Sequence, residues 1–138
     1  MKPILLDTGV IIAWLDRSER YHGQAANLAK ELRQPLITCE AVVAEAFYLL
    51  RRIPQARGSI MDNLASGVFQ IPFRLAESAD EIKLILRKYR DRNIDLADAC
   101  LIHLAEAFDT AKILTLDRDF LFYRWGKNKV FEPLIDLR

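Results

Sequence analysis

The stretch Ile4-Leu5-Leu6-Asp7-Thr8-Gly9-Val10-Ile11-Ile12 is an apolar run that halts at one carboxylate and then resumes as an amphipathic segment. A short apolar run directly ahead of a helical pattern is typical of a buried parallel strand that leads into a helix. On this interpretation Asp7 stands at the carboxyl end of the strand. Ligands of open α/β sheets bind in the crevice outside the carboxyl ends of the strands, so the sequence predicts that Asp7 faces a functional site.

The rest of the chain alternates short apolar runs with longer helical patterns. Further strands are expected at 36–38, 68–71 and 112–115, with a last, weak edge strand at 129–131. Helices are expected at 8–15, 21–33, 40–52, 55–66, 75–92 and 97–108. The helix at 40–52 is apolar nearly all the way round and should be buried on most of its faces. Because parallel neighbours need helical crossovers, the pattern predicts a three-layer α/β/α sandwich around a small parallel sheet of about four or five strands.

Composition sets limits on the class of protein. With 138 residues, 51% of them hydrophobic, the chain is expected to form a single domain spanning residues 1–138. A net charge of +1 favours neither a nucleic-acid partner nor an acidic one. No apolar stretch approaches the roughly 20 residues that cross a bilayer, so we expect no membrane association and a cytoplasmic protein. Cys39 and Cys100 are expected to be small buried residues, and His22 and His103 are too few for a zinc site.

Four carboxylates stand where the local pattern does not require them. Asp7 and Asp117 each follow a predicted strand, and a parallel sheet would bring both to one edge. Glu45 lies in the apolar helix, where an unpaired buried carboxylate costs several kcal/mol unless a cation, a proton or water relieves it. Asp98 lies one turn into the helix that Asp95 opens. Together these residues indicate a divalent cation.

Each aspartate also has a simpler interpretation. Asp7 could cap the first helix. Asp95 and Asp98 fit a cap followed by an acidic residue that interacts favourably with the helix dipole. Asp117 and Asp119 could be ordinary loop and capping residues. Only the conjunction of all these positions favours a site.

Four stretches of the sequence, in order, resemble the PIN-domain nucleases, in particular the toxin ribonucleases of bacterial and archaeal toxin–antitoxin pairs. They are LLDTGV at 5–10, TCEAVVAE at 38–45, DLADA at 95–99 and LTLDRDF at 114–120. The resemblance implies a PIN-like fold with a five-strand parallel sheet, an endoribonuclease activity on RNA, dimerisation, and a small antitoxin protein that blocks the site.

Carried over residue by residue, the resemblance implies an acidic quartet that binds Mg²⁺ or Mn²⁺, with two hydroxyl residues beside it. The quartet is Asp7, Glu45, Asp98 and Asp117, and the hydroxyl residues are Thr8 and Thr115. Asp95 and Asp119 could assist or substitute for their neighbours in the quartet.

The choice between two glutamates stays open. Glu40 competes with Glu45 for the second acidic position, and Glu45 is preferred because it lies at least a full turn inside its helix, among apolar residues. Alternatively, Glu45 could face solvent along a narrow polar stripe with Glu40 and Tyr48.

The residue types fit the implied chemistry. Hard divalent cations prefer carboxylate oxygens and water, so a cluster without Cys or His suits Mg²⁺ or Mn²⁺ better than zinc. Such a metal polarises a phosphodiester and lowers the pKa of its bound water. Arg118 and Arg124 flank the fourth acidic position and are the candidates for contacts with RNA phosphates.

Three rival interpretations remain. A phosphatase of the haloacid dehalogenase type also begins with an aspartate after a strand, but Gly9 stands where its second aspartate is expected. A PIN-like domain could serve as a non-catalytic binding module, although the intact quartet argues against a degenerate site. A free-standing RNA-processing nuclease is the third alternative, and the chain alone does not distinguish it from a toxin.

Overall fold

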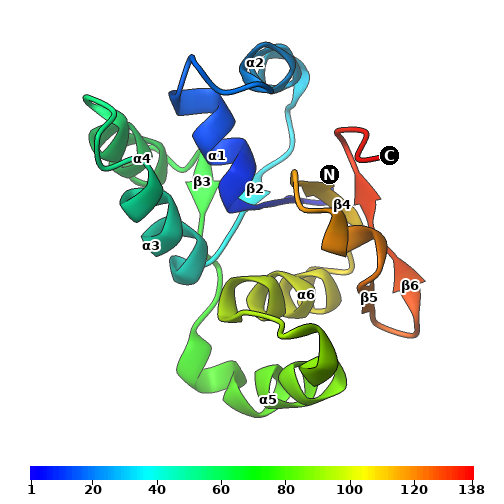
Figure 1. The fold of residues 1–138 in the computed structure, drawn as a ribbon. Coiled ribbons are helices and arrows are strands. Elements are labelled where there is room, and N and C mark those ends of the chain that lie inside the picture. Colours follow the sequence, from blue (N-terminus) through cyan, green and yellow to red (C-terminus); the bar gives the residue numbers. More distant parts are fainter.

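The computed structural model describes residues 1–138 and contains one parallel sheet of five strands in the order β3-β2-β1-β4-β7 (Figure 1). The strands of this sheet are β1 (Ile4–Leu6), β2 (Leu36–Ile37), β3 (Phe69–Gln70), β4 (Lys112–Leu114) and β7 (Glu132–Pro133). All neighbouring strands of the sheet run parallel. The three residues of β1 are fully buried, as expected of a central strand covered on both faces. The predicted α/β fold with a small parallel sheet is confirmed.

Six α-helices connect and cover these strands. They are α1 (Thr8–Leu15), α2 (His22–Glu31), α3 (Glu40–Leu49), α4 (Ala56–Ala65), α5 (Ala79–Lys88) and α6 (Leu96–Phe108). In Figure 1, α1 and α2 lie on one side of the sheet and α5 and α6 on the other. None of these helices is long and apolar enough to cross a membrane. Cys39 and Cys100 are buried free thiols, as predicted.

The predicted long helix at 75–92 is wrong in its extent. The segment divides into the 3-10 helix η1 (Leu75–Ser78), α5, and the 3-10 turn η2 (Arg90–Arg92). Asn93 then adopts a left-handed conformation with φ of 54°, which ends the helical path before Asp95 opens α6. The buried residues that suggest a helix here, Ile82, Ile85 and Tyr89, lie in α5 and at its C-cap, and the flanking 3-10 segments bury none.

The prediction that the helix at 40–52 is buried on most faces is also wrong. Helix α3 packs against α1 and α6 and fully buries Val42 and Ala46. Its outer side carries Tyr48 and Leu49, whose exposed fractions are 61% and 51%. An apolar composition therefore does not reveal how many faces of a helix the rest of the chain covers.

The edge of the sheet differs from the sequence prediction. The segment expected as the last edge strand contains β6 (Lys129–Val130), which pairs antiparallel with β5 (Arg124–Trp125) in a separate hairpin. The fifth strand of the sheet is β7, which pairs with β4. A two-residue strand that ends in Pro133 carries almost no strand pattern, and proline is tolerated there because an edge strand leaves one side unpaired.

Candidate functional site

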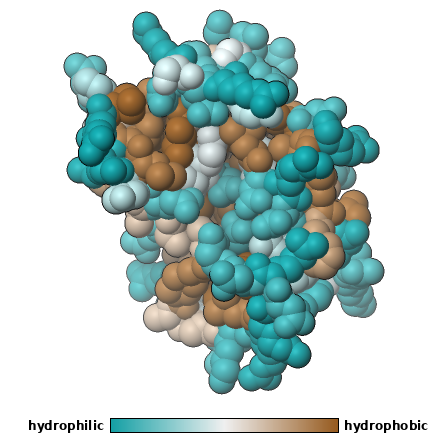
Figure 2. Space-filling view, viewed as in Figure 1, coloured by the Kyte–Doolittle hydropathy of each residue, from teal (hydrophilic) through white to brown (hydrophobic).

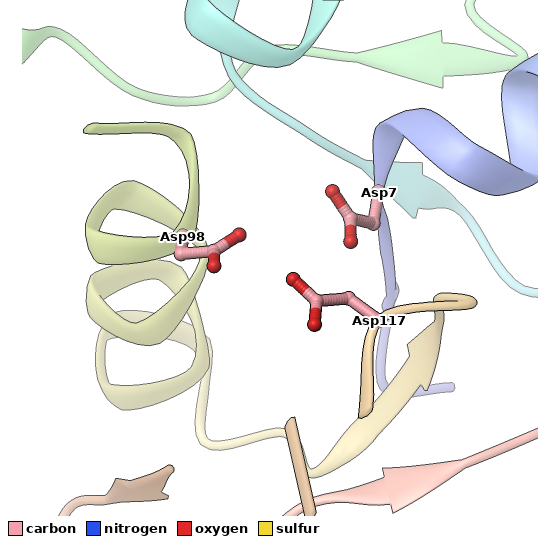
Figure 3. Close-up of side chains that lie close together, drawn as sticks. All are labelled: Asp7, Asp98 and Asp117. Carbon is pink, nitrogen blue, oxygen red and sulfur yellow. The ribbon is translucent and has the colours of Figure 1, made fainter. Parts of the chain in front are cut away.

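Three aspartates from separate parts of the chain converge at the carboxyl edge of the sheet. Strands β1 and β4 are parallel neighbours, so Asp7 after β1 and Asp117 after β4 emerge side by side. Asp98, in the first turn of α6, faces them from the opposite side (Figure 3). Each residue offers one carboxylate oxygen, and these oxygens all lie within 4.8 Å of one another. The arrangement is that of a cation site made of carboxylates alone.

A single buried hydroxyl links two of these carboxylates. Thr115 Oγ1 donates a hydrogen bond to Asp7 Oδ2 at 2.7 Å and accepts one from the backbone N–H of Asp117 at 3.0 Å. The other oxygen of Asp7 accepts from the backbone N–H of Thr8 at 2.8 Å, which also caps α1. Both the capping interpretation and the site interpretation of Asp7 therefore hold, because its two oxygens have different partners.

Hydrogen bonds also position the other two aspartates, Asp98 and Asp117. The backbone N–H of Asp98 donates to Asp95 Oδ1 at 2.8 Å, so Asp95 is the N-cap of α6. The phenol of Tyr123 donates to Asp98 Oδ2 at 3.2 Å. Asp117 Oδ1 accepts from the backbone N–H of Asp119 at 2.9 Å. Each side chain of the group is thereby fixed in direction by a neighbouring donor.

Burial and the charges of nearby carboxylates raise the pKa values of all three aspartates. Burial raises the pKa of Asp7 to about 6, against the hydrogen bonds from Thr115 and Thr8, and the charges of Asp117 and Glu45 add to the rise. Burial, followed by the charges of Asp7, Asp95 and Asp117, raises the pKa of Asp98 to about 8. The pKa of Asp117 is raised too, chiefly by burial. A cation placed among these groups would favour their charged forms and displace the protons.

One buried polar atom near Asp7 in the chain has no partner. The hydroxyl oxygen of Thr8, next to Asp7 in the chain, is a buried polar atom without a hydrogen-bond partner. Buried polar groups are nearly always satisfied by protein or by ordered water, so this hydroxyl calls for an ordered water or a ligand. Carboxylate oxygens together with water are the donor set that Mg²⁺ and Mn²⁺ prefer.

The sequence is similar to those of known proteins. A family model described as PIN domain matches residues 4–126. The chain belongs to the PIN-domain family. It is 31% identical over 117 residues to Ribonuclease VapC26 of Mycobacterium tuberculosis (strain ATCC 25618 / H37Rv), an alignment that covers 83% of this chain and 87% of that protein.

A solved structure shares the fold. The crystal structure of VapC20 from Mycobacterium tuberculosis, described as a Sarcin-Ricin loop cleaving toxin, superimposes with a TM-score of 0.75 at 19% sequence identity. The match covers 84% of this chain and 91% of that one. The resemblance to the PIN-domain family and its VapC-type members is confirmed.

The two competing glutamates of this PIN domain lie in different surroundings. The expectation that Glu45 is a buried carboxylate is wrong, because its side chain is exposed on α3 and stands outside the close group of three aspartates. Its charge nevertheless contributes to the raised pKa of Asp7. Glu40, in the first turn of α3, lines a separate surface hollow with Phe73 and Arg74. The charge of Glu45 therefore acts on Asp7, whereas Glu40 lies beside a different hollow.

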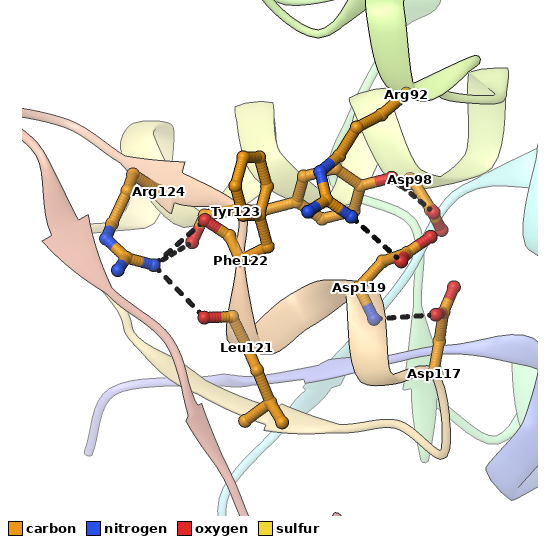
Figure 4. A network of polar contacts seen from close by, with 8 residues as sticks. All are labelled: Arg92, Asp98, Asp117, Asp119, Leu121, Phe122, Tyr123 and Arg124. Atoms are coloured by element: carbon orange, nitrogen blue, oxygen red, sulfur yellow. Dashed lines mark hydrogen bonds and ion pairs between the residues drawn. The ribbon is translucent and has the colours of Figure 1, made fainter.

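The two predicted RNA-binding arginines also differ. Arg118 is exposed and makes no ion pair or side-chain hydrogen bond. Arg124 Nη1 donates to the carbonyl oxygens of Leu121, Phe122 and Tyr123 at 3.2, 2.9 and 3.0 Å (Figure 4). The guanidinium of Arg124 thus braces the turn that carries Tyr123. The sequence pattern gives no sign of this role, because both the donor and the acceptors depend on how the turn is folded.

Proposed function

We propose that this PIN domain is a metal-dependent endoribonuclease and the toxin of a toxin–antitoxin pair. The observation that carries the proposal is the convergence of Asp7, Asp98 and Asp117, whose carboxylate oxygens lie within 4.8 Å of one another. The relative at 31% identity is a ribonuclease, which favours RNA as the substrate. The structural neighbour is described as a toxin, which favours the toxin branch of the family.

The three aspartates would hold Mg²⁺ or Mn²⁺, and Glu45 is proposed as the fourth acidic residue. When bound, such a cation polarises the phosphodiester and lowers the pKa of its water, so that hydroxide is available near neutral pH. The unpartnered hydroxyl of Thr8 is suited to hold a water beside Asp7. Asp119 and Asp95 would support the site indirectly. The backbone N–H of Asp119 donates to Asp117, and the Asp95 carboxylate accepts from the backbone N–H of Asp98.

The chain's own residues fix the geometry that hydrolysis needs. Thr115 keeps Asp7 and Asp117 at a set separation, and Tyr123 fixes the direction of Asp98. Preorganised groups of this kind avoid reorganisation at the moment of reaction. Arg118, exposed directly after Asp117, is placed to contact an RNA phosphate at the rim of the site.

Exposed apolar surface supports the proposal that this PIN domain binds a protein partner. Apolar residues gather at the upper left of Figure 2, where Figure 1 shows α1 and α4. Tyr48 and Leu49 on α3 are also exposed. Contiguous exposed apolar surface marks protein interaction sites. We propose an antitoxin and a second copy of the chain as the proteins that bind this PIN domain.

The test is cleavage of a panel of RNA and DNA, single-stranded and structured, by the purified protein with Mg²⁺, Mn²⁺ or EDTA. The Asp7→Asn variant, which keeps the size of the side chain, is the matched control. RNA cleavage that needs the metal and is lost in the variant supports the proposal. If the wild-type protein, freed of any co-purified partner, leaves every RNA uncut with either metal, the nuclease proposal fails and a binding role replaces it.

A further inference from the structure

An arginine outside the acidic motifs lies over an exposed aromatic ring at the rim of the site. The guanidinium carbon of Arg92 is 3.3 Å from the ring centroid of Phe122, which places the cation directly on the ring face. Arg92 Nη1 also lies 3.5 Å from Asp119 Oδ1 (Figure 4). Phe122 has an exposed fraction of 47%, and the Arg92 side chain one of 41%. The pair is therefore open to solvent.

These contacts leave most of the guanidinium's binding capacity unused. The group carries five N–H donors, and its single hydrogen bond goes to Asp119. An exposed ion pair of this length adds little to folding stability. By contrast, Arg124 uses three hydrogen bonds on backbone carbonyl oxygens. Arg92 is thus held in position while its other donors remain free for a ligand.

The position of Arg92 is tied to the acidic group through one short segment. Asp119, which pairs with Arg92, also donates its backbone N–H to Asp117 Oδ1. Phe122, which lies under Arg92, is followed by Tyr123, whose phenol donates to Asp98. Asp119 therefore contacts both Arg92 and Asp117. Phe122, under Arg92, is next in the chain to Tyr123, which contacts Asp98.

The negative charge around the three aspartates would repel an RNA strand, and a nearby cation such as Arg92 would offset that repulsion. The corner contains Asp7, Asp98 and Asp117, with Asp95 and Asp119 beside them, so an approaching strand meets negative charge wherever a bound metal does not compensate it. The planar guanidinium matches the oxygens of a phosphate with paired hydrogen bonds.

Resting on the proposed ribonuclease function, we propose that Arg92 binds a backbone phosphate of the RNA next to the scissile one. Phe122 and Asp119 are positioning residues in this role: the ring holds the plane of the guanidinium, and the carboxylate orients it. Binding of the adjacent phosphate at Arg92 would align the scissile linkage with Asp7, Asp98 and Asp117.

The test compares Arg92→Gln with Arg90→Gln in cleavage of a short fluorogenic single-stranded RNA that contains every base. Arg90 lies in the same 3-10 turn, is exposed, and donates only to the backbone oxygen of Arg87, so its loss removes the same charge from the same element. Arg92→Gln should raise KM about tenfold, the effect of losing one charge-assisted contact, with kcat within about twofold. The slope of log KM against log salt should fall by about 0.7, the loss expected for one phosphate contact on a single strand.

Two further variants separate binding from structure. Arg92→Lys keeps the charge and should restore most of the salt slope while recovering only part of the KM, because a lysine lacks the planar fork. Phe122→Leu should raise KM with the salt slope intact, because the cation remains but its plane is no longer held. Thermal midpoints should change little in Arg92→Gln.

The outcome that overturns this inference is distinct from the failure of the nuclease proposal. If the wild-type protein cleaves the RNA and Arg92→Gln behaves as Arg90→Gln in KM and in salt slope, Arg92 does not contact phosphate. A lowered thermal midpoint with an unchanged KM likewise assigns Arg92 a purely structural role. If the wild-type protein neither cleaves nor binds RNA, both proposals fall together.

Discussion

At the scale of single residues, Thr115 is the most informative side chain of the site. It is fully buried, and its one hydroxyl both donates to Asp7 and accepts from the Asp117 backbone. Its removal leaves a buried carboxylate oxygen and a half-buried N–H unpaired, and unpaired groups of this kind are costly. The distance between two carboxylates of the site thus depends on a residue that need not touch the substrate.

We predict that Thr115→Val, which keeps the shape of the side chain, lowers the free energy of unfolding by about 1–3 kcal/mol and sharply reduces cleavage. Thr115→Ser retains the hydroxyl and should preserve most of both. Urea unfolding and RNA cleavage rates measure the two effects. Wild-type cleavage by Thr115→Val would show that the link between Asp7 and Asp117 is dispensable.

The two glutamates of α3 provide a second prediction. Glu45 affects the pKa of Asp7, whereas Glu40 lines a hollow elsewhere. Glu45→Gln should therefore reduce metal-dependent cleavage by at least about tenfold, the effect of losing a group that supports the ligands of a metal, and Glu40→Gln should leave it near the wild-type level. The reverse order would assign the fourth acidic position to Glu40.

The sequence predicts where a residue lies when the position depends only on a strand end or a helix start. Asp7 and Asp117 follow parallel strands, and Asp98 lies in the first turn of a helix, so the sequence pattern suffices to place all three. The contributions of Tyr123 and Arg92 escape the same reasoning, because their contacts depend on how the turns at 90–92 and 118–121 fold. Aromatic and cationic residues in turns carry no periodic signal.

At the scale of elements, the start of α6 decides where Asp98 lies. Asp95 caps the helix by accepting from the Asp98 N–H, and the buried residues that follow, including Ala99, Cys100 and Leu101, anchor α6 in the core. The helix therefore presents Asp98 to the sheet edge from a rigid base.

We predict that Asp95→Ala costs about 1 kcal/mol of stability through the lost cap and also reduces cleavage, because the first turn carries Asp98. Asp95→Asn keeps a good cap and should preserve stability. Comparison of the two variants by thermal unfolding and by cleavage separates the cap from the charge. Equal losses of stability in both would contradict the capping role.

Elements whose pattern matches their burial are predictable from the sequence, and those at the periphery are not. The fully buried β1 is clear from its apolar run. The two-residue strand β7 and the exposed face of α3 are not, because edge pairing and surface coverage are decided by what the rest of the chain places beside them. Tertiary context outweighs local propensity at such positions.

At the scale of the whole molecule, the fold concentrates negative charge at one end of the sheet. The chain as a whole is nearly neutral, with a net charge of +1, yet the carboxyl edge holds three aspartates whose pKa values are raised. Composition could not reveal this acidic cluster, because it forms only when strands β1 and β4 lie side by side. A protein without bound cation must hold protons there or tolerate repulsion.

The raised pKa values predict how stability without metal depends on pH. The pKa of Asp7 rises from 3.8 to about 6 and that of Asp98 from 3.8 to about 8, so the folded state binds protons more tightly than the unfolded chain. These groups therefore favour folding most below about pH 4, and their contribution falls as the pH rises toward about 8. In EDTA the thermal midpoint should decrease over this range, and Asp98→Asn should flatten the decrease.

The same linkage predicts the effect of metal. Mg²⁺ or Mn²⁺ competes with the protons, so the gain in thermal midpoint on adding either ion should be larger near pH 8 than near pH 5. Differential scanning fluorimetry at both pH values checks this. A gain that is larger at the lower pH would place the ion elsewhere on the protein.

Mn²⁺ binding tests most directly whether the three aspartates form a divalent-cation site for RNA hydrolysis. Electron paramagnetic resonance follows the loss of the free-ion signal during titration of the wild-type protein and of Asp117→Asn. We predict saturable binding by the wild-type protein, at concentrations that match the Mn²⁺ dependence of RNA cleavage, and severe weakening in the variant. Equal Mn²⁺ binding by both proteins, or RNA cleavage that persists in EDTA, would contradict the claim.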